Sequence, residues 1–162
     1  MNIFCLTGPL RVGKGFLLEQ LIRDSRVQIP RWHSVKTVRS LFVETVTEAE
    51  LAGNIAQESY CLVDQDLYGT YHLPFKLLDV RRINLLPLSL STALRWRQTQ
   101  PLQIIYILPD EGYRTRTTNK AWKEYRDNRP DVELLAQTDY QVQLTNPTNK
   151  VLSEIKSILF NP

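Results

Sequence analysis

Short apolar runs alternate along most of the chain with segments of helical character. The apolar runs predict buried strands at 2–7, 83–88, 103–108 and 140–144. The segments that follow them predict helices at 14–23, 91–97, 119–127 and 147–160. Because strands that alternate with helices form mostly parallel sheets with helices on both faces, the pattern predicts an α/β fold.

Two stretches, 31–72 and 110–129, are less regular. Within the first, two strands are expected on either side of an acidic turn at 64–66. A short helix is expected to start after Thr47, because Thr at the N-cap and Glu50 three positions on form a capping box. We expect both stretches to be insertions at the ligand edge of the sheet.

The most informative segment is the run Gly8-Pro9-Leu10-Arg11-Val12-Gly13-Lys14-Gly15, which links the first strand to the first helix. Gly, four residues, Gly, Lys is the core of the phosphate-binding P-loop. Backbone N–H groups and the positive end of the helix would hold phosphate, and Lys14 would reach the β- and γ-phosphates of a nucleoside triphosphate such as ATP. The predicted nucleotide-binding residues are Gly8, Arg11, Val12, Gly13, Lys14, Gly15 and Phe16. The alternative interpretation is a glycine-rich turn with a surface lysine.

The loop lacks one part of the P-loop pattern. The pattern ends in Ser or Thr because a hydroxyl at that position binds Mg²⁺. Here Gly15 and Phe16 follow Lys14, and neither supplies a hydroxyl. The sequence therefore predicts nucleotide binding through the backbone and Lys14 but designates no metal ligand. Arg11 is a candidate to replace part of a metal's charge at the phosphates.

The loop resembles the opening of the guanylate kinase family, which reads Gly-Pro-Ser-Gly-x-Gly-Lys. Further segments resemble the family in the same order along nearly the whole chain. They are Lys36-Thr37-Val38-Arg39, Phe42-Val43, Tyr68-Gly69-Thr70, the run from Ile104 to Pro109, and Asp139-Tyr140-Gln141-Val142. The resemblance implies a P-loop kinase, a three-layer sandwich with a mostly parallel sheet, that transfers phosphate from ATP to GMP with Mg²⁺.

The resemblance also divides the single domain into parts. Residues 31–72 correspond to a small acceptor-binding insert, and residues from about 110 to 129 correspond to a short lid that carries arginines. The core is then formed by 1–30, 73–109 and 130–162.

Five residues are expected to bind the acceptor. Arg39, Tyr60 and Tyr68 would surround a phosphate with a guanidinium and two phenol hydroxyls. Glu58 would accept hydrogen bonds from N1–H and N2–H of guanine, and Thr70 would place a hydroxyl near the base. The alternative for each is a surface or packing role.

The lid segment is rich in basic residues. The predicted catalytic residues are Lys14, Arg114, Arg116 and Arg126. The arginines would close over the triphosphate and stabilise charge that develops during transfer. Alternatively, the segment is a solvated helix with Trp122 and Tyr125 on its buried side.

The chain departs from the family in several places, among them the family's second arginine, which is Phe42 or missing here, and a shortened lid. The loop has Leu10-Arg11 instead of Ser-Gly, and the family's Asp-x-Asp strand aligns with Leu86-Pro87-Leu88, which has no carboxylate. Three functions therefore stay open. They are a nucleoside or deoxynucleoside monophosphate kinase with GMP or dGMP as first acceptor, a catalytically impaired module that binds a nucleotide or a protein, and a kinase of another small phosphorylated acceptor such as a sugar phosphate.

The composition indicates the class of protein and the compartment in which it is expected. A chain of 162 residues, 43% hydrophobic and 23% charged, suits one soluble globular domain. The net charge of +3 does not favour a nucleic-acid partner. Cys5 and Cys61 are interpreted as core residues in a reducing compartment, and two Cys with two His do not predict a zinc site. Without an apolar run of about 20 residues or a basic leader, we expect a cytoplasmic protein with no membrane partner.

Overall fold

Four of the predicted apolar runs lie side by side in one parallel sheet. The computed structural model describes residues 1–66, 69–145 and 148–161. Within these residues the main sheet has five strands in the order β2-β7-β1-β8-β9, all parallel. The strands are β1 (Asn2–Thr7), β2 (Val27–Gln28), β7 (Ile83–Pro87), β8 (Gln103–Leu108) and β9 (Tyr140–Gln143). Strand β1 lies at the centre, so the loop that follows it leaves from the middle of the sheet.

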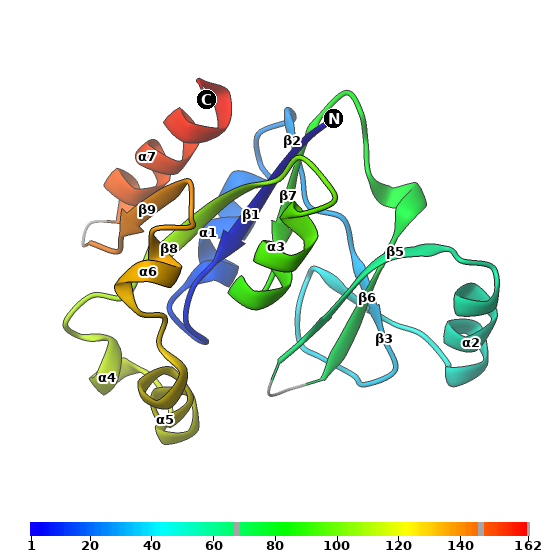
Figure 1. Cartoon of the computed structure of the whole chain (residues 1–162), viewed down its shortest axis with the longest axis horizontal. Helices are drawn as coiled ribbons and strands as arrows, with labels where there is room; N and C mark the ends of the chain where they lie inside the picture. The colour runs from blue at the N-terminus through cyan, green and yellow to red at the C-terminus, as the bar shows by residue number, and fades with distance from the viewer. Residues whose placement is uncertain (67–68, 146–147, 162) are drawn as a thin grey trace.

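Helices cover both faces of this sheet (Figure 1). Phe4 and Leu6 of β1 belong to an apolar cluster that includes α1 (Lys14–Leu21) and α7 (Thr148–Phe160). Ile3 and Cys5, which alternate with them, belong to a second cluster that includes α3 (Leu90–Arg97). Because successive side chains of a strand point to opposite faces, this alternation produces three layers. The predicted three-layer α/β fold with a mostly parallel sheet is confirmed.

A second sheet lies beside the first and carries strands in the order β4-β3-β6-β5. Its strands are β3 (Trp32–Ser34), β4 (Val43–Thr45), β5 (Tyr60–Gln65) and β6 (Thr70–Pro74). Trp32, Leu62 and Leu73 of this sheet pack in the same apolar cluster as α3. The second sheet is therefore fixed to the core by side chains on one of its faces.

Helix α2 (Glu48–Ala56) confirms the predicted capping box. The Thr47 side chain accepts a hydrogen bond from the Glu50 backbone N–H at 3.1 Å, and the Thr47 backbone N–H donates to the Glu50 carboxylate at 2.8 Å. These two bonds satisfy backbone groups that a helix leaves unpaired at its N-terminus. The local sequence signal is sufficient here because both partners lie within one turn.

The predicted acidic turn at 64–66 is wrong. Strand β5 continues through Gln65, β6 begins at Thr70, and the Gly69 N–H donates to the Asp66 carboxylate at 3.1 Å. Asp and Gln are uncommon in strands, which is why the run was expected to turn. In the structure Asp64 faces inward, opposite Tyr71, and other parts of the fold supply donors to its carboxylate.

The remaining elements connect these sheets or border them. They are a 3₁₀ turn at Phe75–Leu77, α4 (Tyr113–Arg116), α5 (Asn119–Asn128) and α6 (Val132–Leu135). Figure 1 shows α4 and α5 on one side of the β1–α1 connection and the second sheet with α2 on the other. Within the described ranges, no helix combines the length and apolar character that a membrane span requires.

Candidate functional site

The glycine loop, defined here as residues 8–15, takes its shape from backbone conformations that few residues adopt. Gly8 has φ of 148°, and a Cβ there would lie 2.8 Å from the carbonyl oxygen of Ile107. Gly13 has φ of 110° and caps α1 without a side chain. Arg11, between them, also has a positive φ, of 58°. The glycines therefore permit a close approach to β8 and a left-handed entry into the helix.

The loop presents a helix N-terminus at its end. The first N–H groups of a helix have no partner within it, so those of Lys14, Gly15 and Phe16 are available to an anion. Val12 is buried in the core and anchors the middle of the loop, and its N–H donates to the Pro9 carbonyl at 3.3 Å. Phe16 is half exposed and does not belong to the cleft lining described below.

Lys14 folds back over the loop that precedes it. Its ammonium donates to the carbonyl oxygens of Gly8 at 2.7 Å and Pro9 at 2.6 Å. Burial lowers the pKa of Lys14 to about 8, and the nearby carboxylates of Asp66 and Asp64 act in the opposite direction. The ammonium is hydrogen-bonded to carbonyl oxygens, so contact with a phosphate would add charge compensation.

A cleft of about 900 Å³ opens beside the loop. Among the described residues, six of the predicted site residues line it together: Gly8, Arg11, Gly13, Lys14, Gly15 and Arg39. The second sheet contributes Trp32, Asp64 and Tyr71, and α5 contributes Glu124 and Tyr125. The loop and the second sheet thus face the same cavity from different sides.

Asp64 brings a buried carboxylate to the end of β7. It accepts hydrogen bonds from the Ser89 backbone N–H at 2.8 Å and the Ser89 hydroxyl at 2.6 Å. Ser89 follows β7 and also caps α3, where its side chain accepts from the Thr92 N–H. Strand β7 itself contains no acidic residue. In the structure, Asp64 of β5 in the second sheet brings a carboxylate to its end.

Asp66 is a second carboxylate of the cleft. It accepts from the Tyr71 hydroxyl and from the Gly69 N–H, both at 3.1 Å. Asp64 and Tyr71 are direct partners across β5 and β6, so the three side chains come from one corner of the second sheet. This corner gives the cleft an acidic wall opposite Lys14.

Three of the predicted acceptor residues do not line the cleft. Glu58 is exposed at the end of α2, with φ of 52°. The pairing register of β5 shifts between Tyr60 and Leu62. The Tyr60 hydroxyl contacts His33 Nδ1 at 2.8 Å and the Asn54 amide at 3.3 Å. Thr70 is exposed at the start of β6. Tyr68 lies outside the described residues.

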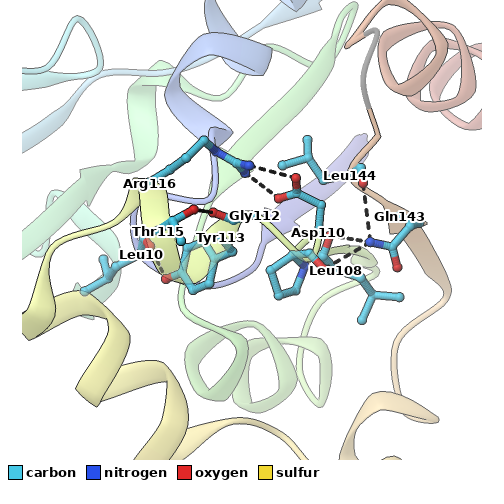
Figure 2. A network of polar contacts seen from close by, with 10 residues as sticks. Leu10, Leu108, Asp110, Gly112, Tyr113, Thr115, Arg116, Gln143 and Leu144 are labelled. Atoms are coloured by element: carbon cyan, nitrogen blue, oxygen red, sulfur yellow. Dashed lines mark hydrogen bonds and ion pairs between the residues drawn. The ribbon is translucent and has the colours of Figure 1, made fainter.

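The three predicted catalytic arginines are exposed, and the cleft lining described above contains none of them. Arg116 forms a two-bond ion pair with Asp110, one bond of 2.8 Å, as Figure 2 shows, and this holds the pKa of the Asp110 carboxyl below its usual value. Arg126 pairs with the adjacent Asp127 at 2.9 Å. The Arg114 guanidinium lies 5.5 Å from the centre of the Trp122 ring.

Comparison with known proteins identifies the fold that positions these residues. No family model and no curated protein matches the sequence. The structure is similar to the crystal structure of guanylate kinase from Anaplasma phagocytophilum, with a TM-score of 0.71 and 16% sequence identity. The match covers 98% of this chain and 84% of that chain. The chain has a guanylate kinase-like fold.

A bound Mg²⁺ fits this version of the guanylate kinase fold less well than a triphosphate does. Gly15 leaves the loop without a hydroxyl. Asp64 and Asp66 already accept hydrogen bonds on the cleft wall. Residues 1–66, 69–145 and 148–161 contain no group of three or more His, Cys, Asp or Glu side chains placed to hold a metal. The loop therefore offers backbone N–H groups and Lys14 to phosphate, and it offers no hydroxyl to a metal.

Sequence reasoning missed Asp64, Ser89 and Tyr71 as cleft residues. The alternation Leu62, Val63, Asp64 carried a usable signal, because Leu62 and Asp64 share the buried face. The hydrogen bonds from Ser89 had no local signal, since Ser89 caps α3 and lies 25 positions from Asp64 of β5.

Proposed function

We propose that this chain is a phosphotransferase that moves the γ-phosphoryl group of ATP to a nucleoside or deoxynucleoside monophosphate, with GMP or dGMP as the first acceptor to test. One observation carries the proposal. The glycine loop with Lys14, Arg39 of the β3–β4 connection and Asp64 of the second sheet line a single cleft of about 900 Å³. A donor triphosphate on the loop and an acceptor phosphate near Arg39 would then meet inside it.

On the donor side, the loop N–H groups would bind the β- and γ-phosphates. Lys14 would exchange the carbonyl oxygens of Gly8 and Pro9 for phosphate oxygens. An acceptor phosphate oxygen then forms a bond to the γ-phosphorus, the bond to the bridging oxygen breaks, and ADP leaves with that electron pair. The ammonium of Lys14 stabilises negative charge on the group in transit.

On the acceptor side, we propose the second sheet, within residues 31–72, as the acceptor-binding insert. Arg39 would pair with the acceptor phosphate. Asp64 would accept hydrogen bonds from the N–H groups of guanine in place of Glu58, because Asp64 lines the cleft and Glu58 does not. The Ser89 bonds would fix the orientation of this carboxylate.

We propose residues 110–129 as the lid. Arg114, Arg116 and Arg126 would contribute only after their side chains leave their present partners and turn toward the loop. The basic charge of α5 would then approach the transferred phosphoryl group.

A second candidate function is a nucleotide-binding module without turnover. Gly15 favours it, because the loop has no hydroxyl to place a metal between the phosphates. A kinase of another phosphorylated acceptor, such as a sugar phosphate, is the third.

One assay separates these candidates. Formation of ADP is followed with ATP, Mg²⁺ and each nucleoside monophosphate in turn, with a sugar phosphate as a further acceptor. We expect turnover with GMP or dGMP that is lost in Lys14→Ala and kept in Lys150→Ala, which changes an exposed lysine on α7. ATP-dependent thermal stabilisation without turnover supports the binding module instead.

A further inference from the structure

Tyr113 connects α4 to the glycine loop. Its hydroxyl donates a hydrogen bond to the carbonyl oxygen of Leu10, 103 residues away in sequence (Figure 2). Leu10 immediately precedes Arg11, the residue with positive φ in the loop. Tyr113 is 2% exposed, so water does not compete freely for its hydroxyl. A hydrogen bond in such a setting is directional and costly to leave unmade.

The Tyr113 ring is fixed by the aromatic residues of α5. Its centre lies 5.4 Å from that of Tyr125 in an edge-to-face arrangement and 6.2 Å from that of Trp122. Trp122 and Tyr125 also contact each other, at 5.9 Å. Tyr125 lines the cleft. The Tyr113 side chain therefore contacts both the glycine loop and α5, which lines the cleft.

The turn that carries Tyr113 is held by the Asp110–Arg116 ion pair. The Arg116 guanidinium lies directly against Gly112, where a Cβ would come within 2.4 Å of Arg116 Nη1. The Tyr113 backbone N–H donates to the Asp110 carbonyl at 3.1 Å. Gln143 of β9 donates to the Pro109 carbonyl at 3.0 Å. These contacts fix the direction from which the phenol approaches the loop.

We propose that Tyr113 is a positioning residue of the glycine loop, and that it couples occupation of the loop to α5. This inference rests on the proposed function, because it takes the loop to be the site of the triphosphate. Loss of the hydroxyl removes the donor to the Leu10 carbonyl and loosens the loop before ATP binds. The affinity for ATP then falls, whereas the affinity for the acceptor on the second sheet does not.

Tyr113→Phe tests this directly, because it removes one oxygen and keeps the ring. Calorimetric titration with ATP should show binding about three to ten times weaker than in the unchanged protein, the range expected for one neutral hydrogen bond. Under turnover, KM for ATP should rise and KM for the acceptor should stay constant. Tyr140→Phe is the matched control, since Tyr140 packs against the same apolar cluster and is not part of the cleft lining described above.

Two further measurements separate positioning from simple stabilisation. Amide hydrogen exchange at residues 9–13 should accelerate in Tyr113→Phe and not in Tyr140→Phe. Asp110→Asn should also weaken ATP binding, and the double variant should be no weaker than Tyr113→Phe alone, because both act through one contact.

The outcomes distinguish this inference from the proposed function. If the unchanged protein does not bind ATP, the proposed function fails. If it binds ATP and Tyr113→Phe binds equally well with unchanged loop exchange, the role of Tyr113 is overturned and the proposed function stands. A lower melting temperature with unchanged ATP affinity assigns Tyr113 a structural role only, which also overturns the inference.

Discussion

At the scale of single residues, the proposed chemistry depends on the charge of Lys14 and the position of Asp64. Lys14 is partly buried and bonded to two carbonyl oxygens of its own loop. Asp64 is a buried carboxylate satisfied by Ser89. Burying either charge lowers the stability of the fold unless a partner compensates the charge, and both residues line the cleft. Such groups are candidates for function because a purely structural side chain at either place needs no charge.

The lowered pKa of Lys14 predicts a pH dependence of ATP binding. With a pKa of about 8 in the free protein, the ammonium loses its proton as pH rises through that value. Phosphate binds the charged form, so affinity should fall by about five- to tenfold between pH of about 7.5 and about 9. Calorimetry across this range checks the fall. Lys14→Arg, which stays charged, should bind with a flat profile, and a fall of equal size in that variant would contradict the assignment.

Asp64→Asn should impair binding of the acceptor and not of ATP. Asn keeps the volume but loses the charge and one acceptor oxygen, so KM for GMP should rise about tenfold or more while KM for ATP changes little. Steady-state kinetics with each substrate varied in turn checks this. Glu58→Gln is the matched control, and the assignment is reversed if that variant raises KM for GMP and Asp64→Asn does not.

At the scale of elements, sequence predicted best what local contacts determine. The strand at 2–7 coincides with β1 and the strand at 103–108 with β8, because each is a continuous buried run. The Thr47 capping box lies within one helical turn. The extent of β5 could not be predicted in the same way. An acidic run is compatible with a strand only when partners such as Ser89 arrive from elsewhere in the chain.

The glycine loop should tolerate no side chain at Gly8. A Cβ there meets the Ile107 carbonyl at 2.8 Å and the backbone has φ of 148°, so Gly8→Ala should lower the free energy of unfolding by about 2 kcal/mol or more and weaken ATP binding. Gly53→Ala is the control, since nothing lies within 4 Å of a Cβ at that helical position. It should raise stability by up to about 1 kcal/mol. Urea unfolding of both variants checks the pair, and equal effects would contradict the loop geometry.

Because Gly15 leaves the glycine loop without a hydroxyl to place a metal, ATP binding should depend weakly on Mg²⁺. We expect the dissociation constant in EDTA to lie within about threefold of that with Mg²⁺. Arg11→Ala should weaken binding in EDTA by about tenfold, because Arg11 lines the cleft beside the phosphates, whereas Arg23→Ala should not. Binding that is abolished by EDTA in the unchanged protein would show that a metal is required at this site.

At the scale of the whole molecule, the cleft exists because two sheets and α5 meet at the loop. Sequence order and periodicity predicted a mostly parallel sheet with helices on both faces, and the family resemblance predicted a three-layer sandwich. Neither could predict that Tyr60 would turn away behind a register shift or that Arg116 would pair with Asp110. Both depend on contacts formed only after the chain has folded, so local sequence patterns could not predict them.

The most direct test of the account is calorimetric titration of the full chain with ATP, in parallel with Lys14→Ala and Lys150→Ala. The account predicts one ATP bound per chain in the unchanged protein and in Lys150→Ala, and affinity reduced by about a hundredfold or more in Lys14→Ala. Equal binding by all three proteins, or no binding by the unchanged protein, would contradict the claim that the glycine loop holds a nucleoside triphosphate.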